Sequence, residues 1–550
     1  MKPTRRNFIQ SLGFSVAGLS VANNSLAKSS NPPKTLKSNN DDQVLFVGDN
    51  IAIANTEYGK VRGFIMRGIH TYLGIPYGAD TSGKNRFMPP QKPASWTDVK
   101  PALWWGNTAP QIMEKRYANV YYSFADHWNY DDVSEDCLKL NVWTPAPDSQ
   151  KRPVMVWLHG GGFVNGNGIE QDGYHGENFA RLGNVVFVSL NHRLGALGYS
   201  DLKAVGGHAA SGNVGNLDMV AALEWVKNNI SNFGGDPNNV TIMGQSGGGS
   251  KVTTLMNMPS AKGLFHKAVV LSGGSLAGVN KEYSAKLGQK VMEEAGLKSG
   301  EIEKLQQIPW LEYINIANRA VDKMADEAKR LGVVRGGFSP VADGEYLSDK
   351  FFTDNHFSAD IPLMICSTFN EQSPSRTEAA LENVTLTDVK EKIKPRFGDK
   401  SGEIVEAYAK NFPKARPIEL WSMIISNRKN AVAIADAKFG LKKAPVYVAW
   451  FGWQPPLFDN RMRAFHCSDI CFWFYNTDLM LTHTGGGKRP RALSDKMAKS
   501  LLNFMKSANP NGGGLPTWKP YTTQNGETMI LDDLPALAND PDREARKTLA

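Results

Sequence analysis

The chain has 550 residues, 41% hydrophobic and 21% charged, so it is long enough for a large buried core and lies in the globular range. Its formal net charge is +8, spread along the sequence without a dense block of Lys and Arg. Because such blocks are typical of nucleic-acid-binding proteins, we expect no nucleic acid among its partners.

Residues 1–27 have the pattern of an export signal. Twin arginines, Arg5 and Arg6, precede a mildly apolar stretch, and Ser25-Leu26-Ala27 offers small residues for cleavage. The stretch is too short for a stable membrane span. The pattern resembles a twin-arginine signal, with an ordinary secretory signal as the alternative, and either predicts a periplasmic or secreted protein. The polar residues 28–44 predict a disordered linker, which leaves 45–550 as the folded domain.

Beyond residue 50, continuous apolar runs alternate with segments of helical periodicity. The runs occupy 153–158, 185–188, 240–243, 268–271, 361–365 and 446–451. Such runs suit strands buried on both faces, and their alternation with helices predicts an α/β domain with a central, mostly parallel sheet flanked by helices. Residues 217–230 have the clearest helical spacing. Residues 278–335 and 385–440 are interpreted as helical insertions, which either cap the active edge of the sheet or pack beside it.

A glycine-rich segment, His159-Gly160-Gly161-Gly162-Phe163, follows the first of these runs directly. It is an H-G-G-G loop, whose main-chain N–H groups can stabilise the oxyanion of a tetrahedral intermediate. Glycines let this backbone approach a substrate without side chains in the way. We predict that the N–H groups of Gly161 and Gly162 form an oxyanion hole together with that of Gly247.

The segment Gly244-Gln245-Ser246-Gly247-Gly248 follows the apolar run 240–243 and matches G-x-S-x-G, the nucleophile elbow. A serine hydroxyl is a weak nucleophile unless it is held exposed beside a base. A sharp strand-to-helix turn holds it there, and that turn needs small residues where the backbone crowds. The elbow and the H-G-G-G loop, each after a strand and in this order, predict Ser246 as the nucleophile.

A serine nucleophile of this type needs a downstream histidine as base, with an acid between the two in chain order. His466 follows the run 446–451 after a loop, a place where α/β sheets carry functional groups, and it is favoured modestly over the other histidines. Glu371 comes just past the run 361–365. The competing histidines and acids are His266, His356 and His483, and Asp343, Glu345 and Asp354.

Four cysteines are too few for a disulfide scaffold in a chain of this length. Cys467 and Cys471 are four residues apart, which leaves a disulfide between them open, because spacing does not define pairing. Together with His466 they lack the spacing of a structural zinc site, so we expect no metal.

At these residues the chain resembles the type-B carboxylesterase family of α/β-hydrolases, over almost all of residues 45–550. Glu135-Asp136-Cys137-Leu138-Lys139-Leu140-Asn141-Val142 is similar to the family signature E-D-C-L-x-L-N-[IV], and Asn191-His192-Arg193-Leu194-Gly195 is similar to its N-[YF]-R-L-G. Asn370-Glu371-Gln372 stands where the family has D-E-G, and Ala464-Phe465-His466-Cys467 where it has A-x-H-G. The resemblance implies the α/β-hydrolase fold and assigns Glu371 and His466 as acid and base.

The chain departs from the family in two places. The family often pairs the cysteine of E-D-C with one just upstream, but residues 108–111 contain none, so Cys137 is predicted to be a free, buried thiol. Gln245 replaces the commoner glutamate before the nucleophile, which removes a negative charge beside Ser246.

The resemblance and the motifs together predict a serine carboxylesterase that acts on a small-molecule ester and needs no cofactor. The alternatives are a lipase for longer acyl chains, or a non-enzymatic binding protein on the same fold, against which the intact Ser246, Glu371 and His466 argue. No sequence feature indicates an oligomeric state. Arg461 and Arg463 lie near His466 in sequence. They are interpreted as solvated loop residues, with recognition of a substrate carboxylate as the less favoured alternative.

Overall fold

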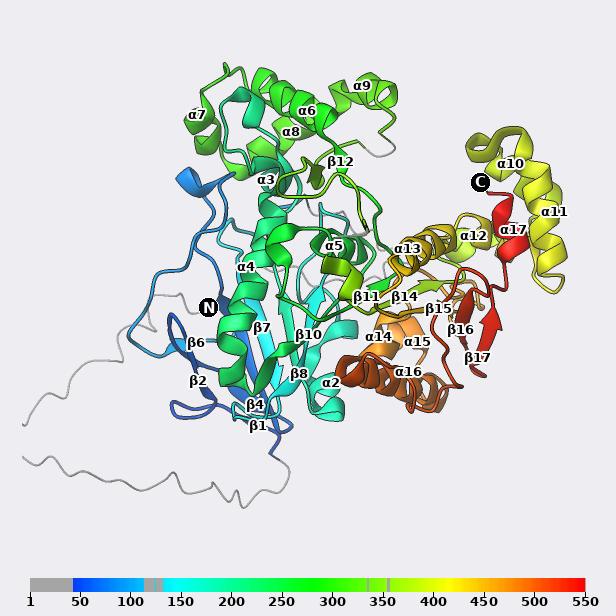
Figure 1. Ribbon diagram of the computed structural model, residues 1–550, viewed down its shortest axis with the longest axis horizontal. Helices are drawn as coiled ribbons and strands as arrows, with labels where there is room; N and C mark the ends of the chain where they lie inside the picture. The colour runs from blue at the N-terminus through cyan, green and yellow to red at the C-terminus, as the bar shows by residue number, and fades with distance from the viewer. Residues whose placement is uncertain (1–42, 113–123, 125–131, 334–335, 354–356, 550) are drawn as a thin grey trace, which may run out of the picture. The chain divides into compact units, whose positions relative to one another are not determined.

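The computed structural model describes residues 43–112, 124, 132–333, 336–353 and 357–549. The predicted export signal and nearly all of the predicted linker lie outside these residues. The described residues centre on a sheet of 12 strands (Figure 1). In spatial order the strands are β1 (Leu45–Phe46), β4 (Phe64–Met66), β5 (Ile69–Pro76), β7 (Lys139–Thr144), β9 (Val186–Leu190), β8 (Arg152–Leu158), β10 (Gly235–Gln245), β11 (Lys267–Leu271), β14 (Leu363–Thr368), β15 (Val446–Phe451), β16 (Glu527–Leu531) and β17 (Ala536–Asn539).

The centre of this sheet is parallel and its two edges are antiparallel. Neighbouring strands from β9 through β16 run parallel, whereas β1, β4, β5 and β7 at one edge and β17 at the other pair antiparallel. The carboxyl ends of β8, β10, β14 and β15 therefore meet at one edge of the sheet, where α/β proteins place their sites. Two small sheets, β12 (Val279–Asn280) with β13 (Val341–Ala342), and β2 (Ile53–Thr56) with β3 (Gly59–Arg62) and β6 (Lys100–Pro101), complete the strands described.

The α-helices of the described residues connect and cover these strands. They are α2 (Gly176–Gly183), α3 (Gly195–Tyr199), α4 (Val214–Asn229), α5 (Gly247–Leu255), α6 (Lys281–Glu294), α7 (Ile302–Gln307), α8 (Trp310–Lys323), α9 (Ala325–Arg330), α10 (Leu386–Phe397), α11 (Ser401–Asn411), α12 (Pro417–Ile424), α13 (Arg428–Gly440), α14 (Ile470–Trp473), α15 (Leu481–Thr484), α16 (Lys488–Ser507) and α17 (Arg543–Lys547). None of them is both long and apolar enough to cross a membrane.

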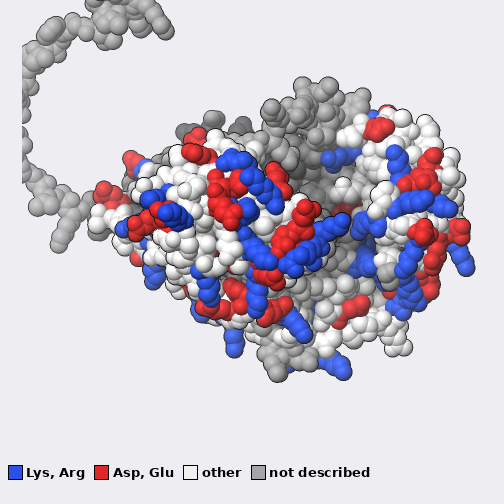
Figure 2. Space-filling model, turned by 90° about the horizontal axis from the view of Figure 1, so that it is seen from above, with Lys and Arg blue, Asp and Glu red and all other residues white. Residues whose placement is uncertain are grey.

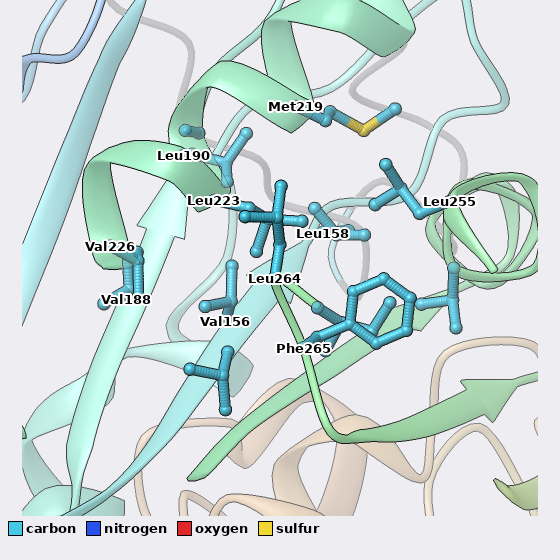
Figure 3. Close-up of a cluster of buried hydrophobic side chains, with 14 of the residues drawn as sticks. Val156, Leu158, Val188, Leu190, Met219, Leu223, Val226, Leu255, Leu264 and Phe265 are labelled. Carbon is cyan, nitrogen blue, oxygen red and sulfur yellow. The ribbon is translucent and has the colours of Figure 1, made fainter. Parts of the chain in front are cut away.

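Alternate side chains of each central strand enter two separate hydrophobic cores. In β8, Val154, Val156 and Leu158 pack under α4, α5 and α13, whereas Met155 and Trp157 pack on the opposite face under α2, α14 and α16. Figure 3 shows the first core, in which strand side chains such as Val156 and Leu158 lie among side chains of α4 and α5. This two-residue period, with both faces buried, explains why the strands are continuous apolar runs and confirms the predicted three-layer α/β architecture.

All described helices of the first predicted insertion pack apart from the central sheet, but the last helix of the second predicted insertion covers it. Helices α6–α9 form their own cluster with α3, at the top of Figure 1, and Phe163 of the glycine-rich loop packs against it. In the second segment, α10–α12 pack with α17, but α13 covers the central sheet between β14 and β15. The second insertion therefore ends before α13, because the parallel connection from β14 to β15 needs a helix to cross over the sheet.

Basic and acidic side chains are interspersed on the face that Figure 2 shows. Over the α6–α9 cluster, for example, Lys286 pairs with Glu327 at 2.5 Å and Arg330 with Glu282 at 3.0 Å. Such exposed pairs contribute little to stability, but they show how the basic residues of this region are matched locally by acids.

Candidate active site

Ser246 sits on a sharp turn between β10 and α5. Its backbone has φ 57° and ψ −121°, a conformation that non-glycine residues rarely adopt. A Cβ at Gly244 would overlap the backbone of Gly248, and a Cβ at Gly248 would overlap the carbonyl oxygen of Leu158. The glycines of G-x-S-x-G are thus required by the close approach of the turn to its own helix and to β8, as the motif predicts.

His466 and Glu371 are joined by a short hydrogen bond. His466 Nδ1 lies 2.6 Å from Glu371 Oε2 and donates to it, and the Glu371 side chain is only 1% exposed. The other carboxylate oxygen, Oε1, accepts the main-chain N–H of Thr368 at 2.9 Å. The two loops are also joined through their backbones, since the N–H of His466 donates to the carbonyl oxygen of Glu371 at 3.1 Å. The carboxylate therefore fixes both the tautomer and the orientation of the imidazole.

The imidazole of His466 lies beside the turn that carries Ser246. Gln245 Nε2 is 3.2 Å from His466 Nε2, the ring nitrogen that faces away from Glu371. The same Gln245 Nε2 is 3.4 Å from His466 Nδ1, so the amide lies against the ring and is not directed at one nitrogen. Since Nδ1 is bonded to Glu371, Nε2 is the ring nitrogen that can accept a proton. The His466 side chain is 28% exposed, so part of the ring is accessible from solvent. The residue that departs from the commoner glutamate thus touches the predicted base.

The glycine-rich loop approaches the same turn from β8. Gly161 and Gly162 have φ of 80° and 66°, which glycine adopts without strain. A Cβ at Gly247 would overlap the backbone nitrogen of Gly162. The backbones of the three glycines predicted to form the oxyanion hole are therefore brought together next to Ser246.

The competing candidates lie in other surroundings. His266 accepts a main-chain N–H of β10 through its Nδ1, and His483 is buried against the aromatic ring that precedes His466. Asp343 Oδ2 accepts a hydrogen bond from the side-chain amide of Asn213, the residue before α4, at 2.8 Å. Glu345 lies in an exposed loop. Two further candidates, His356 and Asp354, lie outside the described residues.

Comparison with known proteins places this geometry in a family. Residues 50–547 match the model of the carboxylesterase family. The chain belongs to the carboxylesterase family. It is 33% identical to para-nitrobenzyl esterase of Bacillus subtilis (strain 168), over 90% of this chain and 98% of that protein. It is 32% identical to cocaine esterase of Homo sapiens, over 88% of each chain.

Solved carboxylesterase structures share the fold of this carboxylesterase. An esterase from Clostridium hathewayi, described as able to hydrolyse aliphatic aromatic polyesters, superposes with a TM-score of 0.78 at 32% identity, over 92% of this chain and 98% of that one. A para-nitrobenzyl esterase structure superposes with a TM-score of 0.74 at 31% identity, over 90% and 99%. The protein has the α/β-hydrolase fold and is a carboxylic ester hydrolase, not a non-enzymatic binding protein.

Both interpretations of Arg461 and Arg463 were wrong. Arg463 is completely buried, and its guanidinium donates to Ser375 Oγ at 2.7 Å and to Glu382 Oε2 at 2.8 Å. Arg461 is also buried and donates to the carbonyl oxygen of Ser375 at 3.0 Å. In this carboxylesterase the two arginines tie the loop of His466 to the segment that follows Glu371, so they are neither solvated nor directed at a substrate.

All four cysteines of the chain lie within the described residues, and no disulfide joins any of them. Cys137 is buried, as predicted, and burial raises the pKa of its thiol. Their spacing left a disulfide between Cys467 and Cys471 open, and the structure shows none. Buried thiols with a raised pKa are poor nucleophiles, so Cys137 is a packing residue.

Proposed function

We propose that this carboxylesterase hydrolyses its substrate through an acyl-enzyme on Ser246. The Oγ of Ser246 attacks the ester carbonyl carbon while His466 Nε2 takes the hydroxyl proton. Glu371 orients the imidazole and stabilises the imidazolium that forms. His466 then gives the proton to the departing alcohol, and it later activates the water that releases the carboxylic acid.

The main-chain N–H groups of Gly161, Gly162 and Gly247 stabilise the oxyanion in both steps. Donors that are already in place before the reaction need no reorganisation, and one such donor contributes about 3–4 kcal/mol to transition-state stabilisation. The convergence of the Gly162 and Gly247 backbones beside Ser246 supports this assignment.

The observation that carries the proposal is the 2.6 Å bond from His466 to Glu371, with the His466 ring against the side chain of Gln245, the neighbour of Ser246. It brings base, acid and nucleophile turn together from three strand ends. In a serine hydrolase, these three groups need to meet in this order.

Hydrolysis of p-nitrophenyl esters, from acetate to palmitate, tests the substrate class. We expect the highest kcat/KM with short acyl chains, and no increase in rate when the ester exceeds its solubility. A rate that rises with chain length and at the interface would favour a lipase instead. Because a relative is named for it, a para-nitrobenzyl ester belongs in the same series.

The pH profile is expected to have an acid limb set by His466. Burial disfavours the imidazolium, but the hydrogen bond and the negative charge of Glu371 outweigh it, so the pKa of His466 is raised from 6.5. The base acts only when neutral. The kcat/KM for p-nitrophenyl acetate should therefore fall about tenfold per pH unit below a midpoint that lies above 6.5. A midpoint below 6.5 would contradict the contact with Glu371.

We also propose that residues 1–27 direct export by the twin-arginine route, which supports a periplasmic or secreted location. Replacing Arg5 and Arg6 by Lys should leave the esterase in the cytoplasmic fraction of the expressing bacterium. Unchanged export of that variant would favour the ordinary secretory route.

A further inference from the structure

A buried amine lies directly behind the glycine-rich loop. Lys251, on α5, is 0% exposed, and its Nζ donates to the carbonyl oxygen of His159 at 2.9 Å. The same Nζ is 3.4 Å from His159 Nδ1. His159 is the residue that opens the loop carrying Gly161 and Gly162. A lysine on the helix that follows the nucleophile therefore holds the start of the loop opposite.

The His159 ring is enclosed by groups that keep it in place. It stacks on the ring of His192, with 5.2 Å between centroids, and its Nδ1 lies 2.9 Å from the carbonyl oxygen of Gly160. A Cβ at Gly166 would lie 2.5 Å from His159 Nδ1 and 3.1 Å from Glu170 Oε2. Burial lowers the pKa of both imidazoles well below 6.5, so the rings are neutral at neutral pH.

Burying the amine of Lys251 costs desolvation free energy, so the need to fill space does not by itself explain a lysine here. Removing a lysine from water disfavours its charged form, and burial lowers the pKa of Lys251 to about 7, against the opposing charge of Glu170. A methionine would fill similar space without that desolvation cost. What the amine adds is a donor to a main-chain carbonyl oxygen at the point where the loop leaves β8.

The loop gains from such an anchor because two of its residues have no side chain to hold them. Gly161 and Gly162 have no side chains to pack, and glycine has the largest choice of backbone conformations. An oxyanion hole contributes to rate only when its donors are held in place before the reaction. Since α5 begins at Gly247, the residue after Ser246, one short helix connects the nucleophile and the third donor to the anchor on the loop.

We infer that Lys251 is a positioning residue for the oxyanion hole: through the carbonyl oxygen of His159, its amine fixes the backbone of Gly161 and Gly162 relative to Gly247. The inference rests on the proposed function, since it assigns a part to Lys251 in the same catalytic site. In this role Lys251 does not contact the ester; it acts only through the backbone of the glycine-rich loop.

The test compares Lys251→Met with a matched control, Lys438→Met. Lys438 is also 0% exposed and donates to a main-chain carbonyl oxygen, that of Ala359 at 3.0 Å, but it lies on α13. Both variants lose a buried bond from amine to carbonyl, so they share any general loss of stability. Only Lys251 contacts the loop.

The readout is specific for the oxyanion. A trifluoromethyl ketone bonds reversibly to the Oγ of Ser246, the hydroxyl proton passes to His466, and the ketone oxygen becomes a hemiketal oxyanion. Lys251→Met should lower kcat for p-nitrophenyl acetate by about 10- to 100-fold with KM changed less than about threefold. The Ki for the ketone should rise by the same factor as kcat/KM falls. Lys438→Met should leave kcat and Ki within about twofold of the wild type while its Tm decreases.

A folded Lys251→Met enzyme with wild-type kcat and Ki would overturn the inference, as would a lower kcat with an unchanged Ki. If Lys251→Met does not fold, Lys251→Gln replaces it, because its side chain is one bond too short to reach the carbonyl oxygen. Its Ki for the ketone should also rise by the same factor as its kcat/KM falls. Failure of the proposed function has a different signature, because the wild type would then form no hemiketal at Ser246, whatever stands at position 251.

Discussion

Ser246→Ala is expected to lower kcat for p-nitrophenyl acetate about 10⁵- to 10⁶-fold, the scale seen when a triad nucleophile is removed. Alanine keeps the Cβ of the turn and removes only the oxygen that attacks the ester. The glycines that surround the turn remain, so the fold should be unchanged. Initial rates at saturating substrate, with protein at high concentration, measure the residual activity.

Ser250→Ala is the matched control for this variant. Ser250 lies one turn further along α5, where its main-chain N–H donates to the carbonyl oxygen of Ser246 at 3.2 Å and would still do so as alanine. Its kcat should stay within about twofold of the wild type, because the side chain is half-buried and the backbone bond is kept. More than a hundredth of wild-type activity in a purified Ser246→Ala enzyme would refute the acyl-enzyme mechanism.

Glu371→Gln should lower kcat about 10³- to 10⁴-fold with little change in KM. The glutamine has nearly the same shape, but it cannot stabilise the imidazolium by its charge. Its amide can also present an N–H to His466 Nδ1, which would select the wrong tautomer. Since Glu371 raises the pKa of His466, the remaining activity should also have its acid limb at lower pH than the wild type.

The same exchange at Glu378, an exposed residue of the segment that follows Glu371, is the control. Glu378→Gln should retain wild-type kcat and the wild-type pH profile. If Glu371→Gln lost activity without any movement of its acid limb, the carboxylate would be a structural residue of the loop and not the partner of the base.

Continuous apolar runs made the strands predictable, because a parallel strand buried on both faces leaves little room for polar residues. Residues 446–451 form β15 as predicted, and 153–158 fall within β8. The run 361–365 is shifted in the structure, where β14 extends to Thr368. Ser367 and Thr368 are fully buried polar residues, so hydrophobicity alone ended this strand too early.

The site was predictable where its chemistry depends on local backbone. Ser246 and the three glycines follow from turns whose sequence requirements are set by close approach. His466 and Glu371 are 95 residues apart. Their position after strands favoured His466 only modestly and left several acids open, so the family resemblance was needed to assign both. Their contact depends on the strand order, which places β14 beside β15, and no single-segment pattern contains that order.

Interpretation from the sequence failed mainly for charged residues that are buried in the structure. Arg463 was interpreted as solvated because its partner, Glu382, is 81 residues away and no local pattern indicates the pair. For Lys251 a signal existed, since it is the one cation in α5, among small and apolar residues on the helix that follows the elbow. A helix in that place packs against the sheet, so a lysine within it points to a specific polar partner.

A covalent label on the nucleophile tests the central claim most directly. The purified esterase would be treated with a fluorophosphonate, and the modified peptide would be identified by mass spectrometry. Our account predicts one adduct per chain on Ser246, loss of activity in proportion to labelling, and no adduct in Ser246→Ala. An adduct on another residue that abolishes activity, or full activity in a completely labelled enzyme, would contradict it.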